Sequence, residues 1–185
     1  FFFKHNPAYE IPLRLVGSEM CIRDRLNTIS MVNSLHNNSV ISELQDIIKN
    51  KIVCTYIPLE NEININDYLT TQALLTTTCN VHNETKVCVY EEPLEKNKYN
   101  VYQPINRKFI EVVDVFLVPG VGFDLKGTRL GKGSGIYDQI LSKFSDSIFF
   151  GVTDRHHIVE HIPSEFHDIS MNGLITHDEI IFIDL

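Results

Sequence analysis

A glycine-rich stretch from Val118 to Asp138, VPGVGFDLKGTRLGKGSGIYD, holds the residue types and spacing best suited to chemistry. Six of the chain's nine glycines lie there, and Arg129 and Lys132 place cations among them. Glycine lets backbone N–H groups approach an anion closely and adopts positive φ without steric cost. A helix expected to begin near Gly135 would direct its positive end at the same place. The combination predicts a phosphate-binding loop.

Asp138 lies in the first turn of that expected helix, where its carboxylate could hold Mg²⁺ beside the phosphates. Two simpler interpretations remain open: the loop is only a connection, and Asp138 only stabilises the helix dipole. Lys132 is not followed by Ser or Thr, so the loop is not a Walker A motif. The spacing of its glycines does not fit a dinucleotide-binding fingerprint either.

A loop of this kind must be held between a strand and a helix. The preceding run, Val112–Val118, is apolar except for Asp114 and predicts a strand covered on both faces. The helix that follows the loop is marked by Ile136, Ile140, Leu141 and Phe144. Ligands of open α/β sheets bind where such a strand ends, which places the site beside Pro119.

Strand-like and helix-like segments alternate along the rest of the chain. Further strands are expected over Ile52–Ile57, Leu74–Val81, Lys86–Tyr90, Ser147–Val152, Leu174–Ile175 and Ile180–Ile183. Further helices are expected over Val40–Ile48 with Ser39 as cap, from Asn66 or Asp67 through Leu74, and over Ile158–Ile162, while Glu91–Lys98 reads as a charged turn. This alternation predicts an α/β fold: a mixed, mostly parallel sheet flanked by helices on both faces, in a Rossmann-like three-layer arrangement.

Length and composition narrow the class of protein. The chain has 185 residues, 43% of them hydrophobic, which fits a single domain with one substantial core and argues against disorder. The formal net charge of −8 argues against nucleic-acid binding, and no apolar run is long enough to span a membrane. The four cysteines show no paired metal-ligand spacing and are too sparse for a disulfide scaffold. These features predict a cytoplasmic protein.

The amino terminus differs from the rest. The segment Leu15–Arg25, LVGSEMCIRDR, resembles the translation of a sequencing-library adapter. We therefore expect residues 1–25 to be a non-native leader and residues 26–185 to form the single domain. A genuine, weakly patterned leader is the alternative.

The glycine-rich stretch resembles the signature of the 5-formyltetrahydrofolate cyclo-ligase family, also called methenyltetrahydrofolate synthetases. That signature has a Pro-Gly-x-x-Phe-Asp turn, then Gly-x-Arg-Leu-Gly-x-Gly-x-Gly, an aromatic pair and Asp. The matching residues here are Pro119, Gly120, Phe123, Asp124, Gly127, Arg129, Leu130, Gly131, Gly133, Gly135, Tyr137 and Asp138. Phe166-His167-Asp168 and Tyr56-Ile57-Pro58 with Glu62 also fit, so the resemblance runs from about Val40 to the end.

The resemblance implies an ATP- and Mg²⁺-dependent ligase that converts 5-formyltetrahydrofolate to 5,10-methenyltetrahydrofolate and releases ADP and phosphate. Phosphorylation turns the formyl oxygen into a leaving group, so that N10 of the folate can close the ring. Catalysis would rest on positioning and on stabilising charge at the transferred phosphoryl group. The implied partners are the reduced folate and ATP, without nucleic acid or membrane, and the protein is expected to be a monomer.

The resemblance also assigns roles to residues. Arg129, Lys132 and Tyr137 would be catalytic, and Asp138 and Asp168 would bind Mg²⁺. ATP would contact Arg129, Leu130, Gly131, Lys132, Gly133, Ser134, Gly135, Ile136 and Tyr137. The folate would contact Ile57, Glu62, Lys132, Gly133, Ser134, Gly135 and Ile136.

Several departures from the family pattern leave a second function open. Ile136 replaces the first aromatic residue of the pair, Ser134 stands where many members have Gly or Lys, and Gln139 replaces a frequent basic residue. The family's amino-terminal helix carries a Lys-x-x-x-Arg pair that contacts ATP, and residues 26–40 supply none. The alternative is therefore a non-catalytic folate- or nucleotide-binding relative, whereas retention of Asp138 and Asp168 favours the enzyme.

Four histidines close together, His156, His157, His161 and His167, suggest a rival site. On a helix, His157 and His161 would share one face and could hold a transition metal. No third ligand stands at a fixed spacing, so a metal site here is the weaker interpretation.

Overall fold

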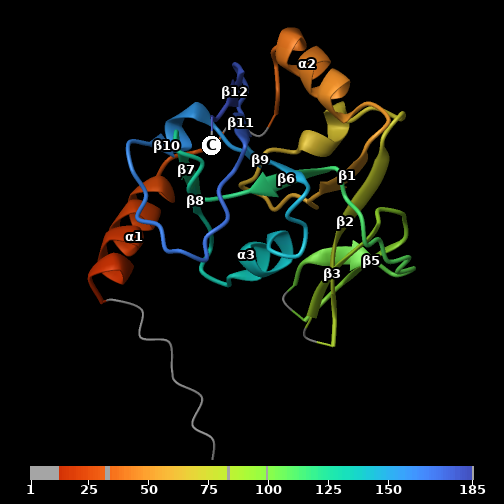
Figure 1. Ribbon diagram of the computed structural model, residues 1–185, viewed down its shortest axis with the longest axis horizontal. Coiled ribbons are helices and arrows are strands. Elements are labelled where there is room, and N and C mark those ends of the chain that lie inside the picture. The colour runs from red at the N-terminus through yellow and green to blue at the C-terminus, as the bar shows by residue number, and fades with distance from the viewer. Residues whose placement is uncertain (1–12, 32–33, 83, 99, 185) are drawn as a thin grey trace, which may run out of the picture.

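The structure, a computed structural model, describes residues 13–31, 34–82, 84–98 and 100–184, with side chains in the first helix from Ser18 onward (Figure 1). The helices are α1 (Leu13–Leu26), α2 (Asn38–Ile48) and α3 (Ile136–Leu141), with two 3₁₀ turns, η1 (Ile65–Tyr68) and η2 (Arg155–His157). The strands are β1 (Ile52–Thr55), β2 (Leu74–Val81), β3 (Glu84–Val89), β4 (Leu94–Lys96), β5 (Tyr102–Pro104), β6 (Val115–Pro119), β7 (Gly122–Asp124), β8 (Arg129–Leu130), β9 (Ile148–Val152), β10 (Ile158–Val159), β11 (Gly173–Ile175) and β12 (Ile180–Phe182). None of these helices is long and apolar enough to cross a membrane.

A seven-stranded mixed sheet forms the centre of the fold, in the order β12-β11-β9-β6-β1-β2-β3. The four inner pairs, β11–β9, β9–β6, β6–β1 and β1–β2, are parallel. Antiparallel pairs, β11–β12 and β2–β3, close the two edges. Two small sheets, β10-β7-β8 and β4-β5, lie outside it. The predicted α/β class with a mixed, mostly parallel sheet is confirmed.

The central strand β6 faces two hydrophobic clusters. Val115 and Leu117 belong to the cluster that contains the buried residues of α2, whereas Phe116 and Val118 belong to the cluster that contains the buried residues of α3. All four side chains are at most 1% exposed. Burying a Val, Leu or Phe side chain stabilises a fold by about 1.5–3 kcal/mol. The strand that leads into the glycine-rich loop is therefore held firmly from both sides.

Helix α2 follows the predicted spacing, because Val40, Leu44 and Ile48 are its buried residues. Its cap is Asn37 and not Ser39, so the predicted cap is wrong by two residues. The Asn37 side chain accepts a hydrogen bond of 2.9 Å from the backbone N–H of Ser39. An extended residue just before the helix can reach that N–H, whereas Ser39 is already inside the helix.

Two predicted helices are wrong. The helix expected to run through Leu74 is only the single turn η1, because β2 begins at Leu74 and pairs there with β1. The helix expected over Ile158–Ile162 is strand β10, which pairs in parallel with β7. Sheet pairing outweighs local helical spacing in both cases. The short strands of the two small sheets were not predicted, and β4 lies within the expected charged turn.

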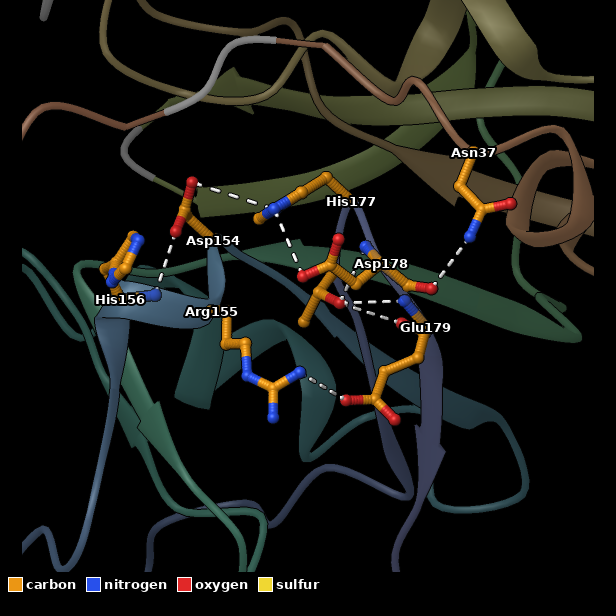
Figure 2. A network of polar contacts seen from close by, with 8 residues as sticks. Asn37, Asp154, Arg155, His156, His177, Asp178 and Glu179 are labelled. Atoms are coloured by element: carbon orange, nitrogen blue, oxygen red, sulfur yellow. Dashed lines mark hydrogen bonds and ion pairs between the residues drawn. The ribbon is translucent and has the colours of Figure 1, made fainter.

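A polar network joins the start of α2 to the carboxy-terminal hairpin (Figure 2). Asp154 is fully buried and accepts a 2.8 Å hydrogen bond from the backbone N–H of His156, which caps η2. His177 lies between Asp154 and Asp178, at 3.8 Å and 3.2 Å. The amide of Asn37 donates to the carbonyl of Asp178 at 3.0 Å. The network therefore fixes three separate segments at the edge of the sheet.

Helix α1 packs against the small sheet β10-β7-β8 at one side of the molecule (Figure 1). Leu26, at its end, is 1% exposed and clusters with Val121, Leu130 and Ile162. Ile22 is partly buried against the same cluster. The helix thus crosses residue 25, where the boundary of the native domain is expected, and its last residue belongs to the core.

Candidate active site

A cavity of about 610 Å³ opens at the carboxyl ends of β1, β2 and β6. This is the edge of a parallel sheet at which α/β proteins bind ligands. Every residue to which the sequence assigned a role lines this cavity: Ile57, Glu62, Arg129, Leu130, Gly131, Lys132, Gly133, Ser134, Gly135, Ile136, Tyr137, Asp138 and Asp168. The predicted residues are brought together, and their roles stay a prediction.

Arg129 is the most enclosed cation of the site, with 6% of its side chain exposed. One terminal guanidinium nitrogen donates to both carboxylate oxygens of Asp138, at 2.9 Å and 3.1 Å. The guanidinium lies over the ring of Tyr137, 5.3 Å from its centroid, and its buried Nε has no partner among the described residues. Arg129 is therefore held rigidly and keeps unused hydrogen-bonding capacity beside the cavity.

Lys132 and Glu62 form a second ion pair across the cavity, with Nζ 2.9 Å from Oε1. The other oxygen of Glu62 accepts from the backbone N–H of Leu59 at 2.9 Å. Glu62 is 12% exposed and Lys132 48% exposed, so the acid is fixed and the base lies in the open part of the cavity. Exposed lysine side chains reorient easily, and Lys132 can turn from Glu62 to an anion.

After Lys132 the loop turns through two glycines with positive φ, Gly133 at 90° and Gly135 at 63°. A Cβ added at Gly135 would meet no atom within 4 Å, and one at Gly133 would meet only the Arg23 guanidinium, at 3.8 Å. Packing therefore does not explain the glycines, whereas backbone conformation and open approach for a ligand do. Gly135 caps α3, and Asp138 lies in its first turn as predicted.

Tyr137 is kept in its neutral form by its surroundings. Burial raises the pKa of its phenol above the ordinary value of 10.0, and the negative charge of Glu62 raises that pKa further. Arg129 and a hydrogen bond with Thr78 oppose the shift. A neutral phenol can donate a hydrogen bond to a ligand oxygen throughout the physiological pH range.

The raised pKa of Tyr137 predicts a loss of stability in alkali. Below pH 10 Tyr137 is protonated in the folded and in the unfolded protein, so it does not make the free energy of unfolding depend on pH. Above pH 10 it ionises in the unfolded chain only, and stability falls by about 1.4 kcal/mol per pH unit for each such group. Between pH 9 and 11, the free energy of unfolding measured in urea should fall less steeply for Tyr137→Phe than for the parent protein. Equal slopes would contradict the shift.

Asp168 reaches the cavity from the loop after β10. Its Oδ2 accepts from the backbone N–H of Glu165 at 2.7 Å, and its Oδ1 lies 3.9 Å from His167 Nε2. Asp138 and Asp168 are hard oxygen donors at one cavity, a set that suits Mg²⁺, which keeps several waters and binds through one or two carboxylates and substrate phosphates. No group of three potential ligands gathers within the described residues, so the carboxylate pair fits Mg²⁺ better than a metal held by the protein alone.

Helix α1 contributes residues that were not predicted. The Arg23 Nε donates to the Gly131 carbonyl at 3.2 Å, and Glu19 lies 3.8 Å from Arg23, one turn earlier. Both line the cavity, so α1 supplies an acid and a base to its wall. Burial raises the pKa of Glu19, Arg23 opposes this, and Asp168 and Glu165 raise it further.

The wall formed by β2 was also missed. Thr77, Thr78, Cys79 and Asn80 line the cavity where that strand ends. The rule that ligands bind at the carboxyl ends of parallel strands could have found them, because Leu74–Val81 was a predicted strand. Side-chain type alone gave no signal there.

The histidines do not form the rival metal site. His157 lies on η2 and is 3% exposed, and strand β10 separates it from His161, so the two do not share a helix face. Burial lowers the pKa of His157, although Asp154 opposes this. His161 instead lies 3.9 Å from Asp124, and His167 3.4 Å from Glu165. No metal cluster is found within the described part of the chain.

Comparisons with known proteins bear on the same residues. Residues 25–177 match the sequence profile of the 5-formyltetrahydrofolate cyclo-ligase family. The chain is 30% identical over 91 residues to the 5-formyltetrahydrofolate cyclo-ligase of Haemophilus influenzae, which is 46% of this chain and 49% of that protein. It is 37% identical over 75 residues to the enzyme of that name from Saccharomyces cerevisiae, 37% of this chain and 36% of that protein. The chain thus spans about half, or less, of the length of these curated relatives.

The fold agrees with a solved structure, that of the 5,10-methenyltetrahydrofolate synthetase of Aquifex aeolicus. The two superpose with a TM-score of 0.74 and 24% identity over 90% of this chain and 93% of that one. The profile match covers the glycine-rich stretch, Asp138, Asp168 and strand β1 with the segment 56–62 that follows it. By this match, which covers most of its length, the chain belongs to the 5-formyltetrahydrofolate cyclo-ligase family.

Proposed function

We propose that the protein converts 5-formyltetrahydrofolate to 5,10-methenyltetrahydrofolate at the expense of MgATP, releasing ADP and phosphate. The observation that carries the proposal is the gathering of the phosphate loop, the two candidate metal ligands and Glu62 around one cavity. Membership of the cyclo-ligase family supports the same reaction.

Arg129 and Lys132 would bind the phosphates of ATP. Each is paired with a carboxylate, Asp138 or Glu62, so anion binding replaces one charge-assisted contact by another. The backbone at Gly133 and Gly135 borders open space and can add N–H donors. Tyr137, neutral and beside Arg129, would donate to the formyl or phosphoryl oxygen. Transition-state charge would then lie against groups that are already oriented.

Asp138 and Asp168 would hold the Mg²⁺ ion. The ion would neutralise the negative charge that these carboxylates and the triphosphate bring together. Arg129 is the ion-pair partner of Asp138. When Asp138 binds Mg²⁺, Arg129 would therefore be released to bind phosphate. Charge at the site is thus redistributed among groups already in contact.

Ile57 and Glu62 would bind the folate. Glu62 is fixed by the Leu59 N–H and by Lys132, and its carboxylate can accept hydrogen bonds from the N–H groups of a pterin ring. The phosphoryl group would pass from ATP to the formyl oxygen with release of ADP. N10 would then attack the formyl carbon and lose its proton to solvent, and phosphate would leave with that oxygen. The cavity would place both substrates at Lys132.

The second candidate function is a non-catalytic folate- or nucleotide-binding relative. Ile136 favours it, since a side chain without hydrogen-bonding groups lines the cavity where the family has an aromatic pair. The lack of a Lys-x-x-x-Arg pair in residues 26–40 favours it as well.

We also propose that residues 1–25 are a non-native leader before a native domain of residues 26–185. The profile match from residue 25 supports this boundary. Glu19 supports it too, because a carboxylate beside Asp168 and Glu165 opposes the binding of a triphosphate. Sequencing the 5′ end of the coding region tests the boundary directly.

We propose a three-layer, Rossmann-like arrangement, because α2 and α3 pack in separate hydrophobic clusters against opposite faces of β6. Cys54, Cys79 and Cys88 are free and buried, which supports a reducing, cytoplasmic compartment. We propose that the protein acts as a monomer, since all residues with a predicted role gather at one cavity within a single chain.

The activity assay follows the absorbance of the methenyl product. Purified protein with 5-formyltetrahydrofolate, ATP and Mg²⁺ should form product, and omission of ATP or chelation of Mg²⁺ should stop it. The assay is run on this chain and on a version that carries the sequenced native amino terminus. Binding of folate or ATP without turnover by the second version would replace the ligase by the binding relative.

A further inference from the structure

The turn between β7 and β8, Asp124–Thr128, leads directly into Arg129. Asp124 is fully buried and does not line the cavity. Its Oδ1 accepts from the backbone N–H groups of Lys126 at 3.0 Å and Thr128 at 2.9 Å. One carboxylate oxygen therefore closes the turn that positions Arg129.

The same turn also holds the loop that carries Asp168, at both of the loop's ends. At the first end, Asp124 Oδ2 accepts from the backbone N–H of Ile162 at 3.0 Å. At the second end, the Gly127 carbonyl accepts from the backbone N–H of Met171 at 2.9 Å. Asp168 lies between these two anchors, so its place is set by the β7–β8 turn.

Gly127 shows how closely the turn fits the second anchor. Its φ is 85°, and an added Cβ would lie 2.4 Å from the Met171 carbonyl oxygen and 3.0 Å from its nitrogen. Both obstacles are backbone atoms and cannot rotate away as a side chain would. Any other residue at this position must push the second anchor outward.

We propose that Asp124 is a positioning residue for the ligase reaction, which sets the place of Asp168 relative to Arg129 and so couples the metal side of the site to its phosphate side. The inference rests on the proposed function, since it concerns Mg²⁺ and ATP. Three N–H donors approach Asp124 from two sides, and only a carboxylate offers an acceptor oxygen to each side. The nearest basic group among the described residues is His161, with Nδ1 3.9 Å from Oδ2.

Asp124→Asn separates the two anchoring tasks. The amide oxygen can still accept from Lys126 and Thr128, but the amide NH₂ then faces the N–H of Ile162, so two donors oppose each other. The turn into Arg129 stays closed, whereas the loop of Asp168 loses its first anchor. The substitution should therefore weaken the binding of Mg²⁺ more than the binding of the phosphates.

The experiment measures binding of a non-hydrolysable ATP analogue by calorimetry, with Mg²⁺ and with EDTA. In the parent protein Mg²⁺ should strengthen binding. In Asp124→Asn this gain should fall by about 10-fold or more, the usual effect of losing a group that orients a metal ligand. Affinity in EDTA should stay within about 2-fold, because Arg129 and Lys132 keep their places.

Asp114→Asn is the matched control, because Asp114 also accepts a backbone N–H through its carboxylate, that of Ile52 at 2.7 Å, and does not line the cavity. In Asp114→Asn, Mg²⁺ should strengthen binding of the ATP analogue as much as in the parent protein. Gly127→Ala, which displaces the second anchor instead, should lose the gain as Asp124→Asn does. An unchanged gain in Asp124→Asn, or an equal loss with and without Mg²⁺, would overturn the proposal.

Amide exchange in the parent protein provides a readout that needs no variant to fold. Addition of the Mg²⁺–analogue complex should slow exchange of the Ile162 and Met171 amides together, while the Ile52 amide stays unchanged. Slower exchange at only one of these two amides would also overturn the proposal. If the parent protein binds no ATP analogue at all, the proposed function fails instead.

Discussion

Asp138→Asn is expected to lower kcat at least about 100-fold, the scale of losing a group that stabilises transition-state charge. The amide can still accept from Arg129, whose terminal nitrogen lies 2.9 Å from Asp138 Oδ2, so the protein should stay folded. The negative charge that Mg²⁺ needs is gone, however. Turnover measured across a Mg²⁺ titration, with circular dichroism to check folding, tests the expectation.

Asp146→Asn provides the control for this substitution. Asp146 is exposed in the turn after α3 and does not line the cavity. The same chemical change there should leave kcat and the Mg²⁺ requirement as in the parent protein. A folded Asp138→Asn protein with near-parental turnover would remove Asp138 from the metal site.

Arg129→Ala is expected to raise the KM for ATP by about 10- to 100-fold and the KM for the folate much less. The guanidinium is a charge-assisted donor, and its loss weakens the phosphate contact first. Because the Arg129 side chain is only 6% exposed and neutralises Asp138, its loss should lower the free energy of unfolding by about 3 kcal/mol. Steady-state kinetics with each substrate varied, together with urea unfolding, measure both effects.

Arg155→Ala is the corresponding control. Arg155 pairs with Glu179 at 3.3 Å, but these side chains are 64% and 49% exposed and lie away from the cavity. An exposed pair of this kind contributes about 0–1 kcal/mol. Equal changes in both KM values for Arg129→Ala would contradict a phosphate role.

The regular central elements could be predicted from the sequence because each carries its own signal. Val40, Leu44 and Ile48 repeat at helical spacing, and the apolar run that contains β6 marks a strand buried on both faces. The glycine-rich loop was located by composition, and its resemblance to a family signature supplied residues far away, such as Glu62 and Asp168. All of them line one cavity.

Features that depend on distant pairing could not be predicted in this way. Ile158 and Val159 have helical spacing to Ile162, but their place is decided by β7, more than thirty residues earlier. Strand β8 is only two residues long, too short for any pattern, and forms because β7 lies beside it. Asp124 belongs to the family signature, but the sequence assigned it no role, because its partners are backbone N–H groups whose positions only the fold reveals.

The position of β6 in the sheet has a consequence for the chain as it is synthesised. Its two neighbours are β1, near the amino end, and β9, which leaves the ribosome only after α3. Until Ile148–Val152 has emerged, β6 offers a bare edge of apolar residues and the glycine-rich loop has no framework. Such non-local parallel pairing forms slowly and leaves nascent chains prone to aggregation. A pause in translation downstream of Pro119 would therefore prolong the interval in which a chaperone has to cover this strand.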